Sequence, residues 1–328
     1  MTTLAITIAV AAVVTVWWRW DSRPIELDEL RARYALPASR FVPLAGVDTH
    51  IVDEGPRAGP VLILLHGNAN SLLIWNDWAR AFVAAGYRVI RFDMPPYGLS
   101  GLAPDGRHGV AATHAALIEL MDREDVSRAV LIGTANGGPP AAWLAFTHPD
   151  RVAGLVFVNT PFYPPTHNTD TLNGQRLARA YVFPYFGRPW FADWLYVREL
   201  AGRGQAIDTR LASHVHDILR RADVPDALAL YGSSYSFAEP RWNPDKLSNR
   251  DMLARIAAPT LIMWGSLSLL PDSEAARLAD TMHNAQPRVR VYPEGGHWLP
   301  IYRPSETAAD VLSFLADVPG FATQQATP

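Results

Sequence analysis

The chain has no cysteine, and neither sign of charge dominates it. Without cysteine there is no disulfide, no thiolate metal site and no cysteine nucleophile. The 29 Lys and Arg residues nearly balance the 32 Asp and Glu residues, which gives a net charge of −3. Nucleic-acid-binding domains are basic, so nucleic acid is excluded as a predicted partner. The sequence also contains no metal-ligand cluster, phosphate loop or dinucleotide motif, and it predicts neither a metal nor a cofactor.

Residues 1–20 are hydrophobic, and residues 4–18 form a run without charge. As a helix this run would be about 22 Å long, shorter than the roughly 30 Å hydrocarbon layer of a bilayer. No basic residue precedes it and no small-residue cleavage site follows it, unlike in a signal peptide. The side chains that follow are typical of a membrane interface: Trp17, Trp18, Arg19, Trp20 and Arg23. We expect a membrane anchor with the main domain on the cytoplasmic side. The alternative is a cytoplasmic protein in which this helix packs on the chain or on a second subunit.

Apolar runs alternate with amphipathic stretches through most of the remaining chain. Continuous apolar runs are typical of strands that are buried on both faces, and they occupy residues 61–67, 87–95, 128–134, 152–160, 259–265 and 288–296. Residues 40–55 predict a hairpin, and helical patterns fall at 74–85, 109–123, after residue 137 and at 304–317. The sequence therefore predicts an α/β fold with a mostly parallel central sheet flanked by helices. Its core comprises residues 40–160 and 246–318, preceded by a linker or docking helix at 21–39 and followed by a tail at 319–328.

Residues 161–245 interrupt this alternation. The segment has a helical pattern and is rich in aromatic residues. An insertion at the carboxyl ends of the strands lies over the usual ligand crevice of an open α/β sheet. We therefore predict a helical lid, some of whose aromatic side chains line a pocket. The alternative is a helical subdomain whose aromatic residues fill only its own core.

Four short motifs occur in a fixed order: HGN (66–68), DMPPYGLSG (93–101), GTANGG (133–138) and GGHW (295–298). On these motifs the chain resembles the lid-bearing branch of the α/β-hydrolase fold superfamily from about residue 40 to 317. That branch includes esterases, lactonases, epoxide hydrolases, dehalogenases and C–C bond hydrolases. The resemblance implies a nucleophile elbow at GTANGG, where a strained strand-to-helix turn exposes one reactive side chain.

In the resembling family the elbow carries a nucleophile, and here that position is Ala135. The resemblance implies that His297 is the general base and that backbone N–H groups near Asn68 and Asn136 form the oxyanion hole. Family members commonly place the acid at the position of Ser268, or after the sixth strand near Asn159, and neither residue is acidic. The nearest carboxylate is Asp272. Thr134 is expected to point away from the apex, and we expect structural roles for His66 and Asp93.

The lid composition and the motifs predict a small hydrophobic substrate or ligand. The candidate pocket residues are Gly67, Phe162, Tyr163, Trp190 and Trp298. Nothing in the sequence identifies the molecule or indicates an oligomeric state.

Three hypotheses follow from the alanine at the elbow. The chain is an inactive or impaired form of a serine-type hydrolase that acts on a hydrophobic ester or lactone. Alternatively, it is a non-hydrolytic member of the fold that binds a ligand. In the third hypothesis, His297 alone serves as a base in lyase, cyclase or oxygenase chemistry. All three use the same pocket, so the sequence leaves them open.

Overall fold

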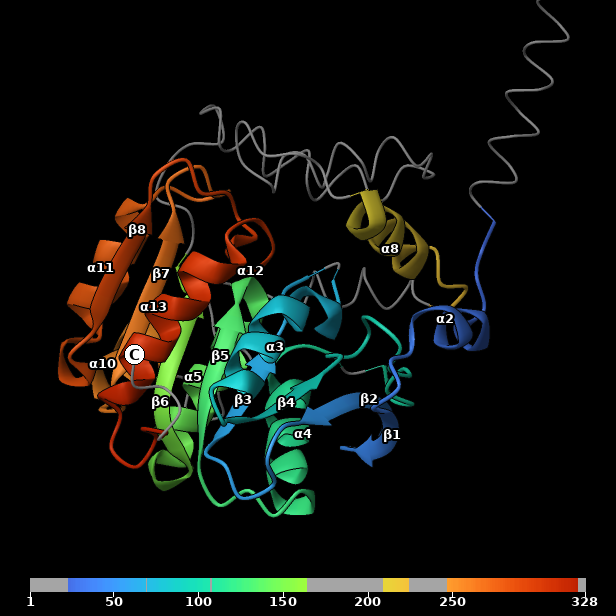
Figure 1. The fold of residues 1–328 in the computed structure, drawn as a ribbon, viewed down its shortest axis with the longest axis horizontal. Helices are drawn as coiled ribbons and strands as arrows, with labels where there is room; N and C mark the ends of the chain where they lie inside the picture. The colour runs from blue at the N-terminus through green and yellow to red at the C-terminus, as the bar shows by residue number, and fades with distance from the viewer. Residues whose placement is uncertain (1–22, 69, 107, 164–208, 224–246, 324–328) are drawn as a thin grey trace, which may run out of the picture.

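The computed structural model describes residues 23–68, 70–106, 108–163, 209–223 and 247–323. At its centre is an eight-stranded sheet in the order β1-β2-β4-β3-β5-β6-β7-β8 (Figure 1). The pairs β1–β2 and β2–β4 are antiparallel, and all other pairs are parallel. This architecture confirms the predicted fold. The strands are β1 (Ser39–Leu44), β2 (Val47–Glu54), β3 (Val61–Leu65), β4 (Arg88–Phe92), β5 (Ala129–Thr134), β6 (Val152–Val158), β7 (Thr260–Gly265) and β8 (Arg288–Tyr292).

The central strands are apolar throughout because helices cover both faces of the sheet. In β3 every residue is buried. Successive side chains of a strand point to opposite faces, so Ile63 packs in one core cluster and Leu62 in the other. The edge strand β8 has only one neighbour, and four of its five residues are exposed.

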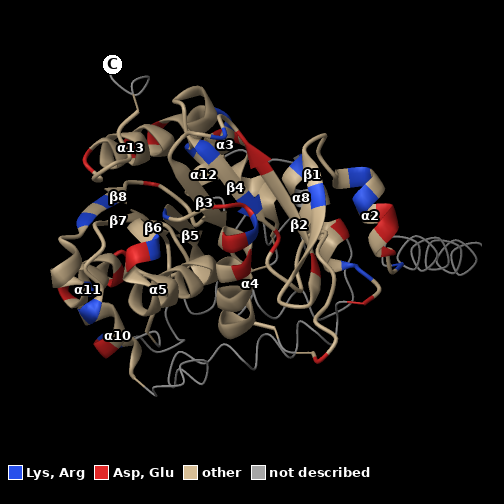
Figure 2. Cartoon of the chain, turned by 90° about the horizontal axis from the view of Figure 1, so that it is seen from below, with Lys and Arg blue, Asp and Glu red and all other residues tan. Residues whose placement is uncertain are grey.

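One helical layer contains α3 (Asn76–Ala84), α12 (Leu299–Tyr302) and α13 (Pro304–Ala316). The other contains α4 (Val110–Arg123), α5 (Gly138–Thr147), α10 (Asn249–Arg255) and α11 (Ser273–Thr281) (Figure 1). Short 3-10 helices are η1 (Leu72–Trp75), η2 (Ala135–Gly137), η3 (Pro149–Arg151) and η5 (His283–Ala285). Basic and acidic residues are interspersed over the described elements (Figure 2), in keeping with the near-neutral composition.

Two further helices, α2 (Leu27–Tyr34) and α8 (Thr209–Leu219), lie beside each other at one end of the sheet (Figure 1). The Ile25 N–H donates to the Arg220 carbonyl at 2.8 Å, and the Ala222 N–H donates to the Ile25 carbonyl at 3.0 Å. The Asp217 carboxylate of α8 accepts from Arg33 at 2.5 Å and from Tyr34 at 2.7 Å. Residues 23–36 thus form a strap that binds α8. Of the two roles expected for residues 21–39, a linker or a docking helix, this packing corresponds to the docking helix.

Several predicted features lie outside the described residues. They are the apolar run at 4–18, most of the predicted lid including Trp190, and the end of the tail. Within the described ranges, no helix is both long and apolar enough to cross a membrane.

Candidate active site

Strand β5 ends in the turn that the sequence predicts to be a nucleophile elbow. Ala135 lies at its apex with φ +46°, in the left-handed region that residues other than glycine rarely adopt. Every residue from 129 to 145 is buried except Ala135, so the apex side chain alone stands clear. A Cβ on Gly137 would lie 2.3 Å from the Leu65 carbonyl oxygen, so only glycine fits where the turn passes β3. The turn has the shape that presents a reactive side chain, and it presents a methyl group.

Of the two residues predicted to form the oxyanion hole, Asn136 directly follows Ala135, and Asn68 lies on a loop that is close to it in space. A Cβ on Gly67 would lie 3.0 Å from the Ala135 Cβ, so the loop that carries Asn68 faces the apex. Asn136 begins the helical turn that leads into α5, where the helix dipole favours negative charge. That the two N–H groups bind an oxyanion stays a prediction. The Thr134 hydroxyl is buried and donates to a carbonyl of β6 at 3.1 Å, so it is not a substitute nucleophile.

His297 and Ser268 are brought together from loops after β8 and β7. The His297 Nδ1 lies 2.9 Å from the Ser268 Oγ, and both side chains are buried. Burial lowers the pKa of His297 to about 4, and within the described ranges no carboxylate opposes this effect. His297 is therefore neutral at neutral pH and is a weak base. Asp272, the nearest carboxylate in the sequence, is exposed at the residue before α11 and makes no capping hydrogen bond. The side chain that contacts the imidazole is Ser268.

Asn159 holds the histidine loop against the sheet. It follows β6 with φ +48° and is fully buried. Its Oδ1 accepts from the Gly265 N–H at 2.9 Å, and its Nδ2 donates to the His297 carbonyl at 2.8 Å. Both ends of the amide are used by backbone groups, which a carboxylate at this position could not satisfy. The sequence identified Asn159 only as a position without an acid, because a contact 138 residues away leaves no local pattern.

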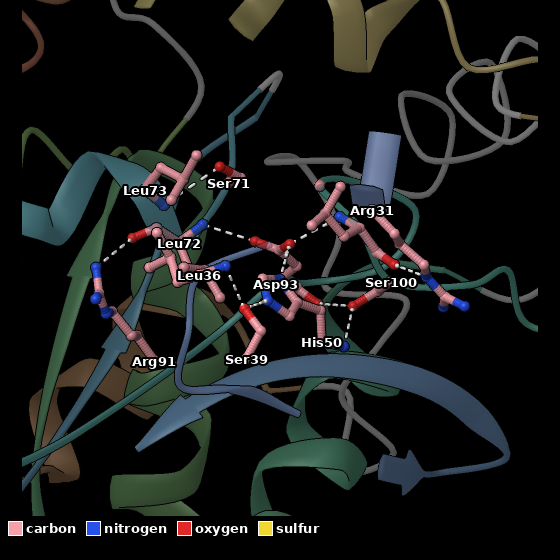
Figure 3. A network of polar contacts seen from close by, with 12 residues as sticks. Arg31, Leu36, Ser39, His50, Ser71, Leu72, Leu73, Arg91, Asp93 and Ser100 are labelled. Atoms are coloured by element: carbon pink, nitrogen blue, oxygen red, sulfur yellow. Dashed lines mark hydrogen bonds and ion pairs between the residues drawn. The ribbon is translucent and has the colours of Figure 1, made fainter. Parts of the chain in front are cut away.

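Asp93 organises the loop after β4 (Figure 3). Its carboxylate accepts from the Leu72 N–H at 2.6 Å, the Leu99 N–H at 2.7 Å and the His50 Nδ1 at 2.7 Å. Burial alone would raise the pKa of Asp93, but His50, His66 and the Leu99 N–H together lower it to about 2. Asp93 is therefore ionised, and its contacts suit the structural role expected from the sequence.

His66 also has both nitrogens occupied by the backbone. Its Nδ1 donates to the Gly67 carbonyl at 2.7 Å, and its Nε2 accepts from the Met94 N–H at 2.9 Å. Burial lowers the pKa of His66, so the neutral form fits this pattern of one donor and one acceptor.

The aromatic pocket candidates that the structure describes are packed in the protein interior. Phe162 packs against Phe157 with ring centroids 5.1 Å apart, in the main core cluster. The Tyr163 hydroxyl donates to the Thr281 Oγ1 at 2.7 Å, which fixes this ring against α11. Trp298 is 4% exposed at the start of α12. Phe162 and Tyr163 therefore pack in the core beneath the sheet, which is neither a pocket lining nor the core of a separate helical subdomain.

Two contacts of the α8 region were not anticipated from the sequence. The Arg221 side chain is fully buried, and its Nη1 donates to three carbonyls of the β4–α4 loop, at residues 96, 98 and 100. The His214 Nε2 lies 2.7 Å from the Ser71 Oγ, beside the loop that carries Asn68. Both contacts span more than 120 residues, so only the folded chain reveals them.

The comparisons with known proteins agree with this geometry. A family model described as the alpha/beta hydrolase fold matches residues 60–194, which include the β3 loop and the elbow. The match and the sheet order show that this chain has the α/β-hydrolase fold. Among the described residues of this α/β-hydrolase-fold chain, no group of three or more His, Asp or Glu side chains is placed to hold a metal.

Relatives of this α/β-hydrolase-fold chain include enzymes with different substrates. It is 26% identical over 287 residues to a 2-hydroxymuconate semialdehyde hydrolase from Pseudomonas sp. (strain CF600), covering 85% of this chain and 94% of that protein. The crystal structure of a membrane phospholipase A superposes with a TM-score of 0.72 at 20% identity, covering 97% of this chain and 99% of the other. A serine-to-alanine mutant of a meta-cleavage product hydrolase from Pseudomonas fluorescens IP01, complexed with acetates, superposes with a TM-score of 0.68 at 21% identity. That comparison covers 84% of this chain and 96% of the other, and the two structural likenesses show the fold alone.

Proposed function

We propose that this chain retains the ligand site of a carboxylic ester or lactone hydrolase and, with alanine at residue 135, binds its ligand without turning it over. One observation carries the proposal. Ala135 is the single unburied residue of an otherwise buried elbow, in the conformation that a nucleophile requires. An alanine forms no acyl-enzyme, so the usual two-step hydrolysis cannot begin there.

The remaining groups favour binding of a carbonyl compound. The backbone N–H groups of Asn68 and Asn136, with the α5 dipole, are proposed to bind the carbonyl oxygen. The neutral His297 adds no charge to the site. A serine-to-alanine mutant of the Pseudomonas fluorescens fold neighbour is complexed with acetates, which supports including small carbonyl compounds among the ligands tested.

The proposal extends to the organisation of the chain. We propose that residues 161–245 are inserted as a lid over the core of 40–160 and 246–318, and that residues 4–18 associate with a membrane. The fold neighbour named as a membrane phospholipase A supports testing lipid-like esters among the ligands.

The test is the Ala135→Ser variant, assayed against chromogenic esters and lactones of varied chain length. In subtilisin, loss of the nucleophile costs about as much as loss of the whole triad, roughly 2 × 10⁶ in kcat, whereas loss of the acid costs about 3 × 10⁴. Because the serine variant still lacks an acid, the expected gain over the Ala135 chain is roughly 10²-fold. No gain on any ester or lactone would contradict the hydrolase site.

A second candidate function rests on the Ser268–His297 pair. A hydroxyl partner leaves His297 neutral, and a neutral imidazole beside an oxyanion site can remove a proton from carbon next to a carbonyl. This function predicts that the Ala135 chain exchanges the α-hydrogens of a bound ketone or ester with deuterated water. Exchange that persists in the His297→Gln variant would refute it.

A further inference from the structure

Beside the loop that carries Asn68, two buried side chains each leave one nitrogen without a partner. Asn70 is fully buried, and the Ser71 N–H donates to its Oδ1 at 2.9 Å, while its Nδ2 has no partner among the described residues. His214 is 4% exposed, and its Nε2 contacts the Ser71 Oγ, while its Nδ1 has no partner in the same ranges. Native proteins leave few such atoms unsatisfied, and an ordered water or a ligand commonly supplies the missing partner.

Both unpartnered atoms are hydrogen-bond donors. The Ser71 N–H needs an acceptor, so the atom that it contacts on Asn70 is the oxygen and the other is the NH₂ group. The Ser71 Oγ accepts from the Leu73 N–H at 3.2 Å. We assign its own hydrogen to the His214 Nε2, 2.7 Å away, so that the hydroxyl both accepts and donates. Burial lowers the pKa of His214 to about 4, and the neutral ring then carries its hydrogen on Nδ1.

Two carboxylates act electrostatically on His214. They are the ionised Asp93 and Asp217, and Asp217 is itself paired with Arg33 and Arg220. An anion that accepted from the two donors would face these carboxylates at low dielectric. A neutral oxygen acceptor meets no such repulsion.

We propose that Asn70 and His214 form a donor subsite that binds a neutral carbonyl or ether oxygen of the ligand, separate from the carbonyl held at Ala135. The inference rests on the proposed function, because one loop leads from Gly67, which faces Ala135, to Asn70 and Ser71. The ligand would then carry a second oxygen function, as a keto ester or an ether ester does. α8 contributes one of the two donors, so the inserted segment takes part in ligand selection.

Matched probes test the subsite in the full chain by calorimetric titration. Ethyl hexanoate, ethyl 5-oxohexanoate and the monoethyl ester of adipic acid share a similar chain and differ in the second group. The keto ester should bind the Ala135 chain roughly tenfold tighter than ethyl hexanoate, and each donor that is removed should cost about threefold to tenfold. The carboxylate probe should bind no better than ethyl hexanoate.

Two variants assign any preference to its donors. Asn70→Asp keeps the oxygen that Ser71 contacts and removes the NH₂ group, and His214→Phe removes the ring N–H. Each should lower the preference for the keto ester, whereas Ser213→Ala, at an exposed position on α8, should leave it unchanged. Thermal melting of each variant shows whether it is folded.

The outcomes separate the two proposals. Equal binding of ethyl hexanoate and the keto ester by the unaltered chain overturns the donor subsite alone, because an ordered water then occupies it. Tighter binding of the carboxylate probe overturns its neutral character. If none of the three probes binds, the proposed function fails together with the subsite. The comparison of ethyl hexanoate with the keto ester uses only the unaltered chain, so it tests the donor subsite even if a variant does not fold.

Discussion

Giving His297 a carboxylate partner should convert the serine variant into an efficient hydrolase. The change is Ser268→Asp in the Ala135→Ser background. The Ser268 Oγ lies 2.9 Å from the His297 Nδ1, so a carboxylate oxygen placed near the same point would accept directly from the imidazole. Ser268 is 1% exposed and aspartate is one atom longer, so the loop has to shift slightly to keep the contact at hydrogen-bond distance.

The expected magnitude follows from the charge that is added. Opposite unit charges about 4 Å apart at an effective dielectric of 20 attract by ~4 kcal/mol. That energy corresponds to a roughly thousandfold higher proton affinity of His297, whose pKa burial now lowers to about 4. Restoring the acid should raise kcat by about 10⁴ beyond the serine variant, in line with the cost of removing it from a complete triad.

The assay is the pH dependence of ester hydrolysis by both variants. His297 must be deprotonated to act as a base, so activity of the serine variant should be lost only as the pH falls through about 4. In the double variant the midpoint should move to higher pH while the plateau rate increases. A matched control, Ala135→Ser with Ser268→Asn, adds a polar group of the same size without charge and should give no gain. If the double variant shows neither a rate gain nor a shifted midpoint while it melts near the unaltered chain, then His297 is not the base of this site.

Three other predictions concern stability. Asn159→Asp should lower the free energy of unfolding by about 1–3 kcal/mol in urea titrations, because the variant loses the buried donor to the His297 carbonyl. Asn284→Asp is the control: it loses a solvent-exposed donor to the Ala254 carbonyl, and water replaces that contact. Equal losses in both variants would contradict the role given to Asn159. The free energy of unfolding should fall as the pH drops from 6.5 towards 4, because the pKa of His297 is lower in the folded chain and the unfolded chain takes up more protons. At pH 5 this histidine alone should lower the free energy of unfolding by ~2 kcal/mol. His297→Gln should therefore flatten the dependence of that free energy on pH, measured by chemical unfolding. Arg221→Lys should destabilise the chain by roughly 3 kcal/mol and speed proteolysis in the β4–α4 loop, because one ammonium cannot reproduce the three carbonyl contacts and the Asp223 pair. The control is Arg57→Lys at an exposed position, which should do neither. An Arg221→Lys chain as stable as this control would show that Arg221 does not hold the β4–α4 loop.

The sequence was sufficient for the sheet because buried parallel strands have a local signature. The apolar runs at β3, β5 and β7 are buried at every residue, so their backbone N–H and C=O groups have to pair with a strand on each side, in a sheet covered on both faces. The tight turns at Gly137 and Gly265 were also visible in the sequence, because close backbone contacts exclude any larger residue there.

What the sequence could not supply depends on long-range contacts between polar side chains. The pairing of Ser268 with His297 and the contact of Ser71 with His214 join loops that are far apart in the chain. Their residue types are common on protein surfaces, so composition and periodicity do not mark them. The packing of Phe162 and Tyr163 in the core of the sheet was not anticipated, because only their neighbouring side chains reveal it.

The strap formed by residues 23–36 sets a limit on how the chain can be shortened. Removal of the apolar run is an obvious step for expression in aqueous buffer, and a cut just before β1 would look harmless from the sequence. Such a cut would remove Ile25, which bridges to Arg221, and Tyr34, which donates to Asp217, so α8 would lose its support. A truncated protein intended for binding assays should therefore begin no later than Arg23. A version that starts at Leu36 would report on a different molecule.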